Sequence, residues 1–196
     1  MSNGFYLFGL PEEKIFMSAM NLPNLLSISR VFLVPVVMVF LTLRTQFGFI
    51  EGANIGDILA GLIFIIASLT DAADGYIARK RGMVTNLGKF IDPLADKIMV
   101  VAVLVALVDL HRVPAWMVVV IISREFIVTG LRMIAASEGI VIAASKSGKL
   151  KTVSQIIGIV LLIFNIPGGI AVMWVAMILT IWSGGDYLVK SMNLLE

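Results

Sequence analysis

Long apolar stretches, separated by short polar segments, follow one another along most of the chain. Each approaches the roughly 20 residues that a helix needs to cross the hydrocarbon core of a bilayer. The pattern predicts six spans, at residues 24–43, 55–78, 88–110, 114–136, 148–165 and 169–188. The segment NIPGG at 165–169 predicts a turn between the last two spans, because proline and glycine interrupt helices. Gly184 and Gly185, followed by Asp186, indicate that the last span ends near them.

The first 20 residues are mixed in character and precede the first span. Pro11, Glu12 and Glu13 are typical of a helix start, since proline fits the first turn and acids favour the positive end of the helix dipole. We therefore expect residues 1–20 to be an extension containing a short amphipathic helix on the membrane surface, with a flexible tail as the alternative. Residues 21–196 are expected to form one membrane domain.

Composition favours an all-α, polytopic membrane protein with six transmembrane helices. Hydrophobic residues make up 59% of the chain and charged residues 14%, and the mean hydropathy is +1.01. A soluble helical bundle would need more polar surface, because soluble domains carry about 25% charged residues. The absence of cysteine excludes disulfides and thiolate metal sites. The net charge is only +2, and we do not expect a nucleic-acid partner.

Positive charges concentrate in the loops on one side of the predicted bundle. The 79–89 and 137–151 loops carry most of them, whereas the opposite side has only Arg44 and Arg112. The positive-inside rule then places both termini and both basic loops in the cytoplasm.

Four aspartates gather where the second span ends and the third begins. Asp71 and Asp74 are three residues apart, and Asp92 and Asp96 are four residues apart, so each pair lies on one helix face. The loop between the two helices is short, which makes them antiparallel neighbours with their cytoplasmic ends together. We therefore expect all four carboxylates to meet at one point.

Such a cluster predicts a metal site. Each aspartate at membrane depth costs up to roughly 3 kcal/mol, and four like charges also repel one another. Oxygen ligands alone favour Mg²⁺ or Mn²⁺, and several carboxylates indicate two ions, an arrangement that suits phosphoryl displacement. Gly75 and Ala78 leave room for a ligand, and Arg79 can pair with a phosphate. The alternative is a set of salt bridges with Arg79, Lys89 and Lys97 at a solvated helix end.

The spacing of this region resembles the signature of the CDP-alcohol phosphatidyltransferases. The match reads Asp71-x2-Asp74-Gly75-x2-Ala78-Arg79-x8-Gly88-x3-Asp92-x3-Asp96, with all eight positions present. Further segments are similar to those of the bacterial phosphatidylglycerophosphate synthases within that family, namely NLPNLLSISR (21–30), FIDPLADKIMV (90–100), SREFIVTGLR (123–132) and SKSGKLKT (145–152).

The resemblance implies a homodimeric enzyme of the bacterial inner membrane, with its active site on the cytoplasmic side. It implies transfer of a phosphatidyl group from CDP-diacylglycerol to sn-glycerol 3-phosphate, with release of CMP. In this family pattern Asp71, Asp74, Asp92 and Asp96 would bind the metals, and Asp96 would also act as the general base. The residues implied for CDP-diacylglycerol binding are Asn24, Ser27, Arg30, Gly75, Ala78, Arg79 and Gly88.

The acceptor adds a second phosphate, so the site needs cations besides the metals. Arg124 and Arg132 are about two turns apart in the fourth span, and a buried arginine demands an anionic partner. Glu125 follows Arg124 directly but points elsewhere on a helix, so we expect it to be an imperfect partner. We expect Arg124, Arg132, Lys149 and Lys151 to line the acceptor-phosphate pocket. For the lysines, contact with anionic lipid headgroups is the alternative.

Two other functions stay open at this point. Another enzyme of the family, with a serine, inositol phosphate or cardiolipin-type acceptor, would share residues 71–96, which handle the common donor. A divalent-cation transporter would use the same aspartates but would also need polar residues along a path through several spans. The outer halves of the second and third spans are almost wholly apolar, which disfavours such a path.

Overall fold

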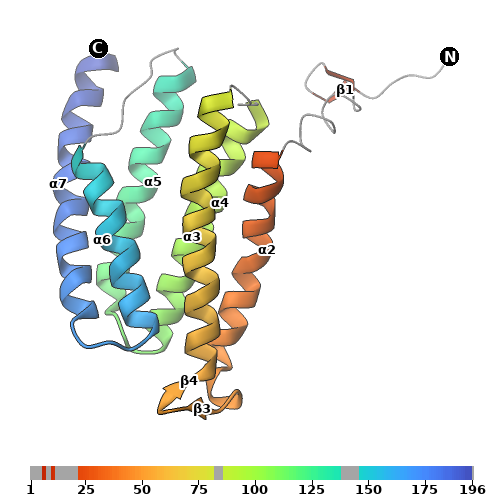
Figure 1. The fold of residues 1–196 in the computed structure, drawn as a ribbon. Helices are drawn as coiled ribbons and strands as arrows, with labels where there is room; N and C mark the ends of the chain where they lie inside the picture. The colour runs from red at the N-terminus through yellow and green to blue at the C-terminus, as the bar shows by residue number, and fades with distance from the viewer. Residues whose placement is uncertain (1–5, 8–9, 12–21, 82–85, 138–145, 196) are drawn as a thin grey trace.

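The structure, a computed structural model, is a bundle of long α-helices (Figure 1). It describes the backbone of residues 6–7, 10–11, 22–81, 86–137 and 146–195. Side chains are described for residues 28–70, 97–135 and 147–189. Within these ranges the predicted all-α class is confirmed, with only two very short antiparallel strand pairs.

Six α-helices make up the described bundle, and each overlaps one predicted apolar stretch. Their bounds are α2 (Leu22–Thr42), α3 (Ile55–Arg81), α4 (Asn86–Asp109), α5 (Ala115–Ser137), α6 (Lys146–Ile163) and α7 (Gly169–Leu195). Among the described residues one segment, Gly169–Val189 in α7, is long and apolar enough to cross a membrane by length and hydropathy alone. Ile28–Thr42 and Ile55–Thr70 are shorter apolar helical segments.

The predicted turn at 165–169 is confirmed, and the helix that follows it extends beyond the predicted end of the last span. Asn165 and Gly168 adopt positive φ angles of 53° and 95° between α6 and α7. α7 then continues through Gly184 and Gly185 to Leu195. A glycine inside a helix costs only about 1 kcal/mol, and the packing of α7 against α5 and α6 outweighs that preference.

The N-terminal prediction fails at one residue and is otherwise untested. Pro11, expected in the first turn of a helix, lies in β2 (Leu10–Pro11), which pairs with β1 (Tyr6–Leu7). Proline is tolerated there because a two-stranded pair leaves an edge that needs no N–H donor. Residues 12–21, where the rest of the surface helix was predicted, lie outside the described residues.

The six helices form two groups that share one core. α2 packs on α3 and α4, whereas α7 packs on α5 and α6. Contacts of α4 with α5 and α6, and of α3 with α6, join the groups. Fully buried side chains from four different helices, including Phe64, Leu104, Ile121 and Ile159, fill the space between them. This core sets the spacing of α4, α5 and α6, which form most of the pocket described below.

A buried carboxylate ties together the end of the bundle that carries β3 (Phe49–Ile50) and β4 (Ala53–Asn54). Asp57 Oδ2 accepts hydrogen bonds from Arg112 Nη2 at 2.6 Å and Arg44 Nη1 at 3.0 Å. Arg112 Nη1 also donates to the carbonyl oxygens of Leu162 and Ile163, at 3.0 and 2.6 Å. Both carbonyls belong to the last turn of α6, where helical N–H donors run out, although that of Leu162 also accepts from Asn165 N at 3.2 Å. Both cations that the sequence places on this side are therefore bound within the protein.

Candidate functional site

The aspartate-bearing turns lie at the opposite end of the bundle. Figure 1 places the end of α3 and the start of α4 there, together with the ends of α5 and α7. Asp71 and Asp74 belong to the last three turns of α3, and Asp92 and Asp96 to the first three turns of α4. Residues 82–85 join the two helices, so the chain itself holds their ends within roughly 18 Å of each other.

Several predicted site residues lie outside the described side chains. They are Asn24, Ser27, Asp71, Asp74, Gly75, Ala78, Arg79, Gly88, Asp92 and Asp96. Their backbone is helical, as expected, but the meeting of the four carboxylates stays a prediction. Among the side chains that are described, no three acidic or histidine groups gather into a metal site. Arg30, the remaining predicted donor ligand, is buried in α2 with 3% of its surface exposed.

A pocket of about 670 Å³ adjoins these turns, between α4, α5, α6 and α7. Ser68, three residues before Asp71 on α3, lines the pocket. Lys97, which follows Asp96 directly on α4, lines it as well. The pocket therefore reaches residues that lie close in the chain to two of the predicted metal ligands, Asp71 on α3 and Asp96 on α4.

The four cations predicted to bind the acceptor phosphate all line this pocket. They are Arg124 and Arg132 from α5 and Lys149 and Lys151 from α6. Lys97 joins them from α4, whereas Glu125 is the one carboxylate among the described lining residues. The lining therefore has a clear excess of positive charge. Apolar side chains such as Leu104, Ile121 and Ile156 complete it.

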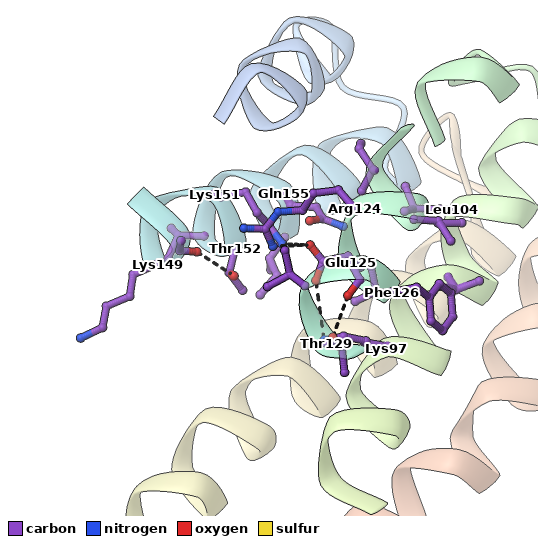
Figure 2. Close-up of a pocket in the computed structure, with 18 of the residues that line it drawn as sticks. Lys97, Leu104, Arg124, Glu125, Phe126, Thr129, Lys149, Lys151, Thr152 and Gln155 are labelled. Atoms are coloured by element: carbon purple, nitrogen blue, oxygen red, sulfur yellow. Dashed lines mark hydrogen bonds and ion pairs between the residues drawn. The ribbon is translucent and has the colours of Figure 1, made fainter. Parts of the chain in front are cut away.

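Glu125 lies at the centre of the cations, as Figure 2 shows. Its Oε1 atom accepts a hydrogen bond from Lys151 Nζ and lies 3.3 Å from Arg124 Nη1. Its Oε2 atom is 3.6 Å from Lys97 Nζ. The pairing of Glu125 with Arg124 is therefore imperfect, as expected: the contact forms, but 3.3 Å is long for a hydrogen bond. Neighbouring side chains leave a helix about 100° apart, but the long arginine chain turns back to the carboxylate inside the shared pocket.

Lys149 and Lys151 occupy different environments although both line the pocket. Lys151 is 4% exposed and paired with Glu125. Lys149 is exposed, and Figure 2 shows its side chain extending away from Glu125. Two residues along a helix correspond to a rotation of about 200°, which explains the difference. Arg132, one turn beyond Thr129, lies at an exposed part of the lining.

α7 supports the pocket from one side. Arg124 Nη2 donates a hydrogen bond of 2.8 Å to Ser183 Oγ. Tyr187, one turn further along α7, is buried and also lines the pocket. Ser183, Tyr187 and Lys97 were not among the predicted site residues. A charge inside an apolar stretch is a signal that could have identified Lys97, whereas nothing in the local pattern marks the two α7 residues.

Comparison with known proteins agrees with the signature at 71–96. The family model for CDP-alcohol phosphatidyltransferase matches residues 20–182. The chain is 44% identical over 188 residues to a CDP-diacylglycerol–glycerol-3-phosphate 3-phosphatidyltransferase of Bacillus subtilis, with 90% of this chain and 97% of that protein covered.

Two further relatives carry related names. A CDP-diacylglycerol–glycerol-3-phosphate 3-phosphatidyltransferase of Haemophilus influenzae is 39% identical, with 86% of this chain and 91% of that protein covered. A probable phosphatidylglycerophosphate synthase of Mycobacterium tuberculosis is 38% identical, with 88% and 82% covered. The match extends over most of the chain in every case, and this chain therefore belongs to the CDP-alcohol phosphatidyltransferase family.

Proposed function

We propose that this chain transfers a phosphatidyl group from CDP-diacylglycerol to sn-glycerol 3-phosphate, giving phosphatidylglycerophosphate and CMP. The observation that carries the proposal is the cationic pocket beside the aspartate-bearing turns of α3 and α4. The names of the relatives at 38–44% identity support this choice of donor and acceptor.

The pocket suits an acceptor that is itself a phosphate ester. Lys97, Arg124 and Lys151 surround a single carboxylate, so their charge is only partly neutralised without substrate. A phosphate dianion offers charge-assisted acceptors for several of these donors at once. Arg132 and Lys149, at exposed parts of the lining, would attract the anion from solvent. Serine, a zwitterion without phosphate, would neutralise less of this positive charge.

The donor and the metals belong at the aspartates. The donor set of four carboxylates fits Mg²⁺ or Mn²⁺, and Asp71, Asp74, Asp92 and Asp96 would hold the ions, two in our proposal. Divalent ions bound at this site would neutralise the charge of the pyrophosphate. Asp96 accepts the proton of the attacking glycerol hydroxyl. The hydroxyl oxygen bonds to the phosphatidyl phosphorus, and the bond from that phosphorus to the CMP oxygen breaks.

The nucleotide and its diphosphate would lie along the small residues of the signature. Gly75, Ala78 and Gly88 leave the backbone accessible, and Arg79 pairs with a phosphate. Asn24, Ser27 and Arg30 of α2 complete the donor site in this proposal. α2 packs on both α3 and α4, which gives its residues access to the same region.

The protein would cross the bacterial inner membrane six times, with both termini and the active site on the cytoplasmic side. Large apolar side chains are exposed on every described helix, among them Phe32 (71%), Ile66 (60%) and Trp182 (75%). Soluble monomers rarely expose so much apolar surface. Residues 21–196 would form the membrane domain, preceded by the N-terminal extension of residues 1–20, and the active form would be a homodimer surrounded by lipid.

A panel of acceptors tests this function. Purified protein with Mg²⁺ and CDP-diacylglycerol is supplied in turn with sn-glycerol 3-phosphate, serine, inositol phosphate and phosphatidylglycerol, and CMP release is measured. We expect turnover with sn-glycerol 3-phosphate alone. Turnover with one of the other acceptors alone would assign the chain to a different branch of the family, and CMP release with none of them would contradict the proposal.

A further inference from the structure

Two consecutive residues of α7 hold the side chain of Arg124. Ser183 Oγ accepts a hydrogen bond of 2.8 Å from Arg124 Nη2. The Ser183 hydroxyl donates to the carbonyl oxygen of Thr180 at 3.4 Å, so its proton is engaged and its lone pairs remain for the guanidinium. Ser183 is 1% exposed, which fixes this acceptor inside the protein.

Gly184 provides the space for the aliphatic part of the same arginine. A Cβ atom at this position would lie 2.9 Å from Arg124 Cγ and 3.3 Å from Arg124 Nε. The first distance is shorter than carbon atoms tolerate, and Cγ is too close to the α5 backbone to move aside freely. A Cβ atom at the neighbouring Gly185 would meet nothing within 4 Å. The arginine therefore requires glycine at 184 and not at 185.

The Arg124 side chain is consequently held at three points, two of them on its guanidinium. Nη2 is bound to Ser183, Nη1 lies 3.3 Å from Glu125 Oε1, and the stem lies against Gly184. Nε is buried and has no hydrogen-bond partner among the described residues. A buried donor without a partner is unfavourable, so Arg124 gives up one hydrogen bond in this position. The packing of α7 against α5 imposes the position on the arginine.

We propose that Ser183 and Gly184, here called the Arg124 seat, are positioning residues that set the affinity for the acceptor phosphate. The inference rests on the proposed function, because it assumes that the pocket lined by Arg124 binds sn-glycerol 3-phosphate. Anion binding by a guanidinium depends on direction as well as charge. A displacement of Arg124 should therefore weaken acceptor binding and leave donor binding at the α3–α4 turns unchanged.

Three variants of the full-length protein test the seat. Gly184→Ala places a methyl group against the arginine stem, Ser183→Ala removes the hydroxyl, and Gly185→Ala is the matched control on the same helix. We expect Gly184→Ala to raise KM for sn-glycerol 3-phosphate by on the order of tenfold, as a displaced charge-assisted contact does. Ser183→Ala should raise it by about threefold, and Gly185→Ala by less than about twofold. KM for CDP-diacylglycerol should not change.

The outcomes separate this inference from the proposed function. Wild-type turnover of sn-glycerol 3-phosphate with equal acceptor KM in Gly184→Ala and Gly185→Ala would overturn the seat and leave the function standing. Wild-type protein that does not use this acceptor would overturn the function itself, and the seat with it. If Gly184→Ala does not fold, the acceptor KM of Ser183→Ala tests the seat instead, because this substitution adds no bulk. A rise in both KM values together with a lower melting temperature would show a merely structural role and would also overturn the seat.

Discussion

Replacement of Lys151 by methionine separates the two α6 lysines that sequence reasoning treats alike. Lys151 is buried and paired with Glu125, whereas Lys149 is exposed and extends away from the pocket centre. Methionine keeps most of the side-chain volume and removes the charge. Lys149→Met is the matched comparison two residues earlier on the same helix.

The expected magnitudes follow from the partners of Glu125. A pair of charges about 4 Å apart is worth about 4 kcal/mol at an effective dielectric constant near 20, before desolvation. In Lys151→Met, Glu125 keeps Lys97 at 3.6 Å and Arg124 at 3.3 Å. We therefore expect the free energy of unfolding to fall by about 1–3 kcal/mol, less than for a carboxylate that loses its last partner.

The effect on substrate binding should be larger and selective. Loss of one charge-assisted hydrogen bond to the acceptor phosphate is worth about 1.5–3 kcal/mol, which corresponds to a rise in KM of about 10- to 150-fold. Lys149→Met should raise KM for sn-glycerol 3-phosphate by less than about threefold, and this smaller effect should disappear at high salt.

The assay is CMP release by purified protein in detergent, with each substrate varied in turn, together with thermal unfolding. Equal rises in the acceptor KM of the two lysine variants would contradict the different roles of Lys149 and Lys151. The assignment of Lys151 to the acceptor site is refuted if Lys151→Met changes only the KM for CDP-diacylglycerol.

Three further predictions concern other parts of the molecule. Asp96→Asn should abolish CMP release without loss of folding, because it removes the proposed general base. The control Asp109→Asn, at the exposed far end of α4, should keep full activity. Intact CMP release in Asp96→Asn would show that Asp96 is not the base. Arg112→Met should lower the free energy of unfolding by about 2–4 kcal/mol, measured by thermal denaturation, and leave both KM values unchanged, because its bonds lie at the end away from the site. Gly56→Ala should have a lower melting temperature than Gly130→Ala. A Cβ atom at residue 56 would lie 2.5 Å from a backbone oxygen of α2, whereas one at residue 130 would meet nothing within 4 Å. Equal melting temperatures would contradict the close packing of α3 on α2 at Gly56.

The helices could be predicted from sequence because each is one long apolar stretch bounded by polar or turn-forming residues. The pair of strands at 49–54 was not predicted, since its two-residue turn, Glu51 and Gly52, lies within a short mixed segment. Glycine in a two-residue hairpin turn is a recognisable signal, but strands of two residues are too short to show alternation.

The acceptor side of the candidate site could be predicted in its residue types but not in its geometry. Arg124 was predicted because a charge inside an apolar stretch needs a partner, and Lys151 because the acceptor phosphate needs cations besides the metals. The central place of Glu125 was missed, because helix periodicity describes where a side chain starts and not how far a long one reaches. The requirement for Gly184 arises only when α7 meets α5, so it has no counterpart in the local sequence.

The central claim is that the acceptor phosphate binds in the pocket beside the aspartates that we propose to bind metal. Mn²⁺ bound to the protein should strongly shorten the ³¹P relaxation time of added sn-glycerol 3-phosphate, and a titration in detergent measures this. We expect this shortening to be lost in the double variant Asp71→Asn/Asp92→Asn, which removes the proposed metal site. We expect it to be lost also in the single variant Arg124→Ala, which weakens the proposed acceptor site. Relaxation that remains the same in wild-type protein and in both variants would contradict the central claim.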